Sequence, residues 1–167
     1  MPRVIHTTVD SPIGELLLKG DGRALTGLYM SGGKFAQTAT DDWERDDDAF
    51  ADVRAQLAAY FAGELTDFEV PLAPVGTAFQ LSVWGALQEI PYGRTESYGQ
   101  LAARVGNVRA CRAVGLANGR NPISIIVPCH RVIGASGTLT GYGGGLERKR
   151  QLLNLETGVL SAARAAA

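Results

Sequence analysis

Residues 123–132 read Ile123-Ser124-Ile125-Ile126-Val127-Pro128-Cys129-His130-Arg131-Val132, so an apolar run leads directly into a thiol and an imidazole. The apolar run at 123–127 predicts a buried strand. Cys129 would then lie at the edge of a packed core, beside His130. A thiol is a weak nucleophile until its proton is removed, and a hydrogen-bonded histidine can remove it. Cys129 is therefore the first candidate for a reactive side chain.

Immediately before this run, the chain has the pattern of a helix-turn-helix. Helical spacing over residues 95–105 and again over 108–118 brackets the short turn Gly106-Asn107. The second helix carries Arg109 and Arg112. It also has small residues that would let it lie close to another surface: Ala110, Ala113, Gly115 and Ala117. Ordinary packing between helices would give the same pattern, so both interpretations stay open.

The segments on either side complete a mostly helical unit. Thr77 is placed to cap a helix that ends at Pro91-Tyr92-Gly93. The predicted buried face of that helix consists of Phe79, Val83, Trp84, Leu87 and Ile90. Between residues 134 and 145, six glycines allow positive φ and could bring backbone N–H groups close to a ligand. Residues 148–155 predict a last helix.

The N-terminal part has a different pattern. Residues 31–47 are rich in Gly, Thr and Asp and predict a mobile loop, while 48–61 have helical spacing that ends at Gly63. Three earlier runs predict strands separated by turns: 4–9, 14–19 and 24–30.

These patterns predict the fold class. An α/β N-terminal domain (antiparallel sheet plus helix) is expected over residues 1–72. A mostly helical C-terminal domain with a helix-turn-helix follows over residues 77–160, and residues 161–167 form a flexible tail. Pro74 and Gly76 mark the boundary between the domains.

The net charge of −1 conceals an uneven distribution. Residues 1–74 carry 6 Lys/Arg and 13 Asp/Glu, a net charge of −7, whereas residues 75–167 carry 10 Lys/Arg and 4 Asp/Glu, a net charge of +6. A basic half favours a polyanionic partner. Charges spread by chance over solvated faces would give the same count, so this feature alone leaves the partner open.

Composition excludes several classes of protein. At 46% apolar and 20% charged residues, the chain has the composition of a globular protein. No apolar run approaches the roughly 20 residues of a membrane span. The start, Met-Pro-Arg-Val-Ile-His, has no secretory signal, so a cytoplasmic location is expected. Two cysteines and two histidines make a structural metal site improbable, and no metal is predicted.

Residues 126–133, Ile-Val-Pro-Cys-His-Arg-Val-Ile, resemble the active-site motif of the O6-alkylguanine-DNA alkyltransferases, also called methylated-DNA–protein-cysteine methyltransferases. The resemblance covers residues 77–156, and the turn at 10–14 is similar to the N-terminal hairpin of the family. The ordered set of motifs is more specific than Pro-Cys-His-Arg alone. The further motifs are Phe79-Gln80, Val83-Trp84, Ile90-Pro91-Tyr92-Gly93, Ser97-Tyr98-Gly99, Arg112-Ala113-Val114-Gly115, Asn121-Pro122, Gly141-Tyr142-Gly143-Gly144-Gly145 and Lys149.

The resemblance implies a catalytic set. Cys129 would accept the alkyl group, His130 would take its proton through a bound water, and Glu156 would orient the imidazole. Asn121 would brace the turn between the recognition helix and the Cys129 segment. Tyr98 would lie near the flipped guanine and its phosphate.

The resemblance also implies residues that bind DNA and the base. Arg112 would enter the base stack in place of the flipped base, with Ala113 and Gly115 beside it. The carbonyl groups of Cys129 and Val132 would accept from the exocyclic amine of guanine, and the N–H of Gly143 would meet O6. The substrate pocket would further contain Tyr142, Gly144 and Lys149.

The implied function is DNA repair by direct reversal. The alkyl group of O6-alkylguanine would pass irreversibly, once per molecule, to Cys129 after base flipping through the minor groove. The partner would be double-stranded DNA, with no cofactor, no obligate protein partner and a monomeric state. The sequence leaves open O4-alkylthymine as a substrate, tolerance for bulky alkyl groups and cooperative assembly on DNA.

Two other functions compete with this one. The first is a lesion-binding module of the same fold without chemistry. Related modules of that kind have Trp at the cysteine position, which Cys129 argues against. The second is an unrelated thiol hydrolase using Cys129 and His130, which would turn over many times.

Overall fold

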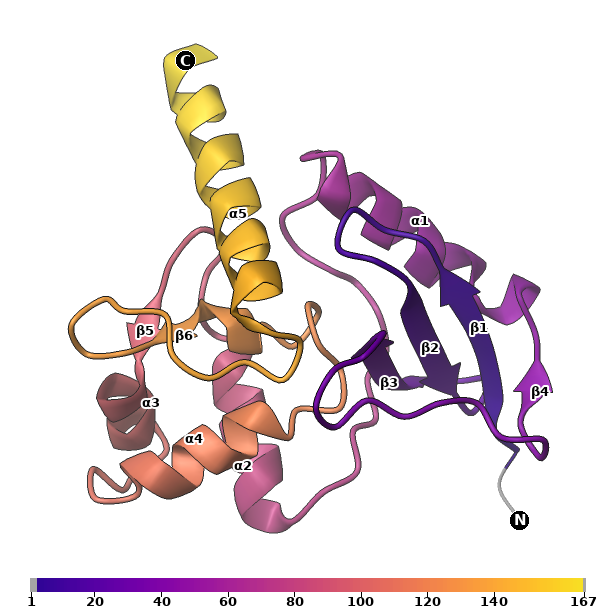
Figure 1. Cartoon of the computed structure of the whole chain (residues 1–167), viewed down its shortest axis with the longest axis horizontal. Helices are drawn as coiled ribbons and strands as arrows, with labels where there is room; N and C mark the ends of the chain where they lie inside the picture. The colour runs from indigo at the N-terminus through magenta and orange to yellow at the C-terminus, as the bar shows by residue number, and fades with distance from the viewer. Residues whose placement is uncertain (1–2, 167) are drawn as a thin grey trace.

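The N-terminal part of the chain forms a small sheet covered by one helix (Figure 1). The computed structural model describes residues 3–166. β1 (Ile5–Val9), β2 (Leu16–Gly20) and β3 (Leu25–Met30) pair antiparallel, and the short β4 (Glu44–Arg45) adds a parallel edge to β1. The three predicted strands are confirmed. β4 lies within the segment predicted to be a mobile loop.

Side-chain alternation along the strands explains how the sheet buries one face. In β2, Leu16 and Leu18 are fully buried while the intervening residues are partly exposed. The 3-10 turn η1 (Asp48–Phe50) leads into α1 (Ala51–Phe61). The buried side of this helical segment consists of Phe50, Val53, Leu57 and Tyr60. Gly63, at φ +77°, follows the helix as the sequence predicts.

The C-terminal part is mostly helical (Figure 1). Its helices are α2 (Ala78–Leu87), α3 (Tyr98–Arg104), α4 (Cys111–Gly119) and α5 (Leu146–Ala166). Between α4 and α5 lie the 3-10 turn η2 (Cys129–Arg131) and β6 (Val132–Ile133), which pairs parallel with β5 (Glu96–Ser97). The predicted fold class is confirmed.

Two capping boxes fix where α2 and α3 begin. The side chains of Thr77 and Ser97 each accept from the backbone N–H three residues on, and Gln80 and Gln100 return the bond. The predicted cap at Thr77 is confirmed. The predicted start of α3 at residue 95 is wrong, because Ser97 caps the helix and residues 96–97 pair with β6 instead.

The helix-turn-helix is present, but its second helix is shorter than predicted. α4 begins at Cys111 rather than at Val108, because Asn107 holds a turn by accepting from the N–H groups of Arg109 and Ala110. Val108 and Leu116 are apolar but are 70% and 68% exposed.

Phe79 on α2 is predicted to lie on a buried face, but it is 38% exposed, so this prediction is wrong. The residues before it, 75–78, are exposed as well, so the first turn of α2 reaches beyond the packed core. The remaining members of the predicted face are buried: Val83, Trp84, Leu87 and Ile90.

The apolar run at 123–127 is not a strand. It forms a turn in which Ile125 takes φ +73°, and only Ile123 makes a bridge, to Leu28 of β3. Positive φ at a β-branched residue is strained and requires support from its surroundings. Ile123 and Ile125 to Val127 are buried, so the apolar composition reflects burial on all sides and not a strand.

The last helix is much longer than the predicted 148–155. α5 extends from Leu146 to Ala166, so residues 161–166 are helical where the sequence predicts a frayed tail. Residues 1–2 and Ala167, which fall in the predicted N-terminal domain and tail, lie outside the described residues. Within residues 3–166, no helix is both long and apolar enough to cross a membrane.

The two parts share one hydrophobic core. Leu28 of β3 donates to the carbonyl of Pro122, and the N–H of Ser124 returns a bond to Leu28. Arg148 at the start of α5 donates to the carbonyl of Ile13 in the β1–β2 turn. These contacts place the sheet against the segment that carries Cys129.

Candidate active site

Cys129 opens into a cavity between the two parts of the chain. Its side chain is 4% exposed and stands on η2. The cavity has a volume of about 290 Å³. Its walls come from the segment after β3, from the end of α4 and from the glycine-rich loop at 134–145; representative lining residues are Met30, Phe35, Asn118, Arg120, Tyr142 and Gly143.

His130 and Glu156 form a buried pair next to the thiol. The His130 Nε2 atom lies 2.7 Å from Oε2 of Glu156, and both side chains are fully buried. Burial would raise the pKa of Glu156, but hydrogen bonds and charge from His130 and Arg131 outweigh it and lower the pKa to about 2. A carboxylate can only accept, so Nε2 carries the proton and Nδ1 of a neutral His130 keeps its lone pair.

The other nitrogen of His130 is therefore the basic one. Burial lowers the pKa of His130 more than Glu156 raises it, so the imidazole is neutral at neutral pH. Among residues 3–166, no protein group lies within hydrogen-bonding distance of Nδ1. This atom is available to take a proton.

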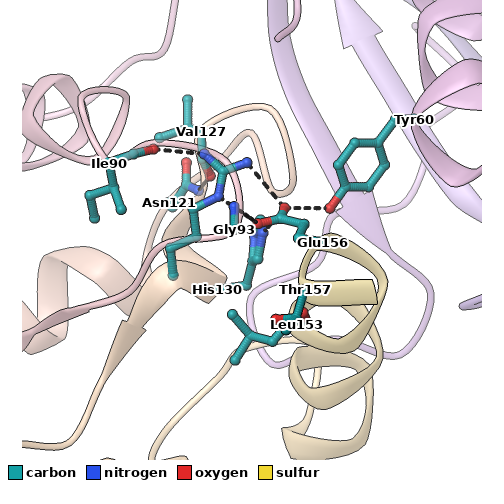
Figure 2. Close-up of polar contacts among 10 residues, drawn as sticks. Tyr60, Ile90, Gly93, Asn121, Val127, His130, Leu153, Glu156 and Thr157 are labelled. Carbon is teal, nitrogen blue, oxygen red and sulfur yellow. Dashed lines mark hydrogen bonds and ion pairs between the residues drawn. The ribbon is translucent and has the colours of Figure 1, made fainter. Parts of the chain in front are cut away.

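The Glu156 carboxylate accepts from three further residues (Figure 2). Arg131 donates from Nε to Oε1 at 2.9 Å and from Nη2 to Oε2 at 3.0 Å. The N–H of Gly93 donates to Oε1 at 3.2 Å, and the Tyr60 hydroxyl donates to Oε2 at 2.7 Å. Sequence reasoning missed all three partners. Arg131 stood inside the cysteine motif, whereas nothing in the pattern of α1 singled out Tyr60.

The thiol is held in its protonated form at rest. Burial raises the pKa of Cys129, although the nearby polar groups of Asn121 and Tyr142 and the charge of Lys149 act in the opposite direction. A reaction at Cys129 therefore needs a base. His130 is the basic group adjacent to it in the chain.

Asn121 braces the strained turn at 123–127. Its Nδ2 donates to the carbonyl of Val127 at 2.8 Å, and its Oδ1 accepts from the N–H of Ile123 at 3.0 Å. The amide thereby closes the turn from both ends and supports the positive φ of Ile125. Asn118, one helical turn earlier, donates to the carbonyl of Cys129 at 3.4 Å, a contact that sequence reasoning also missed.

Lys149 and Tyr98 hold the glycine-rich loop in place. The Lys149 ammonium is fully buried and donates to the carbonyls of Val132 at 2.5 Å and Thr140 at 3.0 Å. Burial lowers its pKa to about 8. The Tyr98 hydroxyl donates to the same Thr140 carbonyl at 3.0 Å. Both residues lie beside the loop that carries the predicted pocket residues.

That loop also contacts the N-terminal part. The N–H of Lys34 donates to the carbonyl of Gly143 at 2.7 Å, and the Arg120 guanidinium lies 4.0 Å from the Phe35 ring centroid. Tyr142, Gly143 and Gly144 line the cavity together with Cys129, whereas Val132 and Lys149, the other residues predicted for the pocket, are not among its lining residues.

Of the residues predicted to contact DNA, Arg112, Ala113 and Gly115 lie on α4, and Tyr98 is the first residue of α3. Arg112 and Ala113 are exposed, and Gly115 is half-buried where an added Cβ would lie 3.8 Å from the Tyr98 ring. The Arg112 guanidinium makes no ion pair with any described residue. The part of the chain from 3 to 166 holds no cluster of three or more His, Cys, Asp or Glu side chains suited to a metal ion.

The chain matches known proteins over both parts. Residues 78–158 match the family described as 6-O-methylguanine DNA methyltransferase, DNA binding domain, and residues 4–74 match the ribonuclease-like domain of the same proteins. The chain is 59% identical over 151 residues to the methylated-DNA–protein-cysteine methyltransferase of Mycobacterium tuberculosis, covering 90% of this chain and 91% of that protein. A protein of the same name from Methanosarcina acetivorans is 56% identical, with 90% and 97% covered.

Solved structures agree with this match. The crystal structure of Mycobacterium tuberculosis OGT in complex with DNA has a TM-score of 0.87 to this chain at 57% identity, and covers 93% of this chain and 94% of that one. Because the family matches cover residues 4–74 and 78–158 and the Mycobacterium tuberculosis relative is 59% identical, the chain belongs to the 6-O-methylguanine DNA methyltransferase family.

Proposed function

We propose that this protein repairs DNA by direct reversal, moving the alkyl group of O6-alkylguanine in double-stranded DNA onto Cys129. The observation that carries the proposal is a buried cysteine beside a neutral histidine whose Nε2 proton is fixed by Glu156 at 2.7 Å. The relatives at 56–59% identity are named for transfer from methylated DNA to a protein cysteine.

The proposed chemistry starts with activation of the thiol. Nδ1 of His130 accepts the Cys129 proton through one bound water, and the Glu156 carboxylate stabilises the imidazolium that forms. The thiolate attacks the alkyl carbon, so that a sulfur–carbon bond forms and the bond from carbon to O6 breaks. The departing guanine is stabilised by a hydrogen bond from the Gly143 N–H to O6 or by protonation of its ring as it leaves, with Tyr98 as the neighbouring donor.

Access to the lesion requires the base to leave the duplex. The O6 substituent of a stacked guanine cannot reach a buried thiol, so the nucleotide is flipped into the cavity. The exposed Arg112 on α4 would fill the gap in the stack, and the small side chains of Ala113 and Gly115 would let the helix lie close to the minor groove. Contacts to the backbone give affinity without sequence preference.

The product limits each molecule to one reaction. A thioether on Cys129 is a stable bond, and nothing among the groups around it would reverse the transfer. The protein is therefore consumed in proportion to the lesions that it repairs, and it acts as a monomer without a cofactor.

Mass spectrometry of the protein after reaction tests the proposal. The protein is mixed with a duplex that carries one O6-methylguanine and with an undamaged duplex as control. We expect a gain of one methyl on the Cys129 peptide that saturates at one per protein, and no gain in Cys129→Ala. Unmodified protein that still binds the damaged duplex would indicate a lesion-binding module. Many turnovers on an ester or peptide would indicate a thiol hydrolase.

A further inference from the structure

A residue of the N-terminal part reaches the buried pair in the C-terminal part. Tyr60, near the end of α1, is completely buried. None of its surface is accessible to solvent, and it does not line the cavity that contains Cys129. Its hydroxyl donates to Oε2 of Glu156 at 2.7 Å, the same oxygen that accepts from Nε2 of His130 (Figure 2).

The position of the Tyr60 hydroxyl is fixed by its surroundings. Its ring packs against Phe68 at 5.3 Å and against Tyr92 at 6.2 Å between ring centroids. Burial and the neighbouring Glu156 charge raise the pKa of Tyr60, so the group remains a neutral donor at any working pH. A donor that can neither move away nor lose its proton holds the carboxylate in one orientation.

We propose that Tyr60 is a positioning residue for the alkyl transfer, through which the N-terminal domain orients Glu156 and sets the basicity of His130. The inference rests on the proposed function. A hydrogen bond to Oε2 draws negative charge away from the oxygen that faces the imidazole. Without it, the carboxylate would stabilise the imidazolium more strongly, and His130 would be protonated at a higher pH.

The other titratable groups around the pair are all still present when the Tyr60 hydroxyl is removed. They come from every element packed against it: Arg131 and Cys129 on η2, Lys149 on α5, Tyr92 after α2 and Tyr142 in the glycine-rich loop. Tyr92 provides a matched control, because it is 8% exposed, packs on the same ring and has a hydroxyl without a partner among the described residues.

The test compares Tyr60→Phe with Tyr92→Phe and the natural protein. Phenylalanine keeps the ring packing in both variants, and thermal melts verify that each is folded. Single-turnover rates on the O6-methylguanine duplex are measured from about pH 5.5 to about pH 9, where the protonation of His130 limits the acid side. In Tyr60→Phe we expect the acid side of the pH–rate profile to shift to higher pH by roughly half a unit. On that side the rate falls about threefold, and at high pH it changes little.

Two results would overturn the inference. If Tyr60→Phe loses the same factor in rate at every pH, Tyr60 has only a structural role. If its pH profile matches that of Tyr92→Phe, Tyr60 does not position Glu156. NMR titration of the His130 ring in the free protein gives a second readout. We expect the pKa of His130 to rise in Tyr60→Phe alone. This readout decides the role of Tyr60 even if the natural protein transfers no methyl group, which would refute the proposed function instead.

Discussion

Glu156 shows how much of the site depends on one buried carboxylate. It accepts from His130, from Nε and Nη2 of Arg131, from the Gly93 backbone and from Tyr60. A buried charge is costly unless it is paired and hydrogen-bonded, and removal of one partner leaves the other charge uncompensated. Glu156 therefore contributes to the fold, and in the proposed mechanism it also orients His130.

Replacement of Glu156 by glutamine should cost about 3–5 kcal/mol of stability at neutral pH, because the buried Arg131 loses its counter-charge. The measurement is urea unfolding followed by circular dichroism. Glu147→Gln on the same helix is the control. Glu147 forms an exposed pair with Arg150, with its side chain 73% exposed, so a change below about 0.5 kcal/mol is expected.

The contribution of Glu156 should also depend on pH. Its folded pKa of about 2 lies below the unfolded value of 4.5, so the unfolded chain takes up the proton first as the pH falls. The stabilisation is fully present above the unfolded pKa and is lost between about pH 4.5 and pH 2, in total about 3 kcal/mol. The stability gap between the natural protein and Glu156→Gln should narrow over this range. A constant gap would contradict the lowered pKa.

At the scale of elements, short-range hydrogen bonds set where helices begin. Ser97 both caps α3 and belongs to β5, so one residue ends a strand and starts a helix. Because Tyr98 is the first residue of α3, the cap also sets the direction in which its side chain extends toward the glycine-rich loop. α4 is positioned by the Asn107 turn, which leaves its arginine-bearing side free.

Ser97→Ala should destabilise the protein by about 1 kcal/mol, because the N–H of Gln100 loses its acceptor and the reciprocal bond is weakened. Chemical denaturation measures the change. Ser82→Ala is the control, since the exposed Ser82 hydroxyl only bonds to the carbonyl of Phe79 within the first turns of α2. An equal cost at both serines would argue against the cap.

Arg112→Ala should slow repair of duplex DNA by far more than it slows reaction with free O6-alkylguanine base. The physical reason is that, in the proposed mechanism, Arg112 acts on the base stack and not on the alkyl carbon. Rates on both substrates are measured under single-turnover conditions, with the exposed Arg150→Ala on α5 as control. Equal slowing on both substrates would refute the intercalating role.

At the scale of the whole molecule, the cavity exists only because both parts meet. The Lys34 N–H holds the Gly143 carbonyl, Arg148 joins Ile13 to the loop, and Tyr60 holds Glu156. The isoleucine turn at 123–127 packs against β3 in the same way. The sheet thus supports the reactive segment from behind.

The shared core predicts one cooperative unfolding transition. In Trp43→Phe, Trp84 is the single remaining tryptophan and reports on the C-terminal part, where it is 2% exposed and donates to the carbonyl of Ala117. Its fluorescence and the far-ultraviolet circular dichroism of the whole chain should give the same denaturant midpoint. Two separate transitions would show that the parts unfold independently.

Local patterns were sufficient for much of this protein. The three strands, the caps at Thr77, the helix-turn-helix and the motif around Cys129 and His130 could all be predicted, because each depends on residues a few positions apart. The predictions that failed concern the ends of helices and the apolar run at 123–127, which was predicted to be a strand. An apolar run reports burial, and burial does not distinguish a strand from a tight turn such as that at Ile125.

The sequence by itself determined the family resemblance, Cys129 as the candidate nucleophile, and the order of most of the elements. Only the tertiary structure decided which groups surround the Glu156 carboxylate, since Tyr60 lies 96 residues away from it in the chain. It also decided that His130 keeps Nδ1 as its basic atom. The physical reason is that hydrogen bonding and burial of a titratable group depend on all segments that converge on it, whatever their separation in sequence.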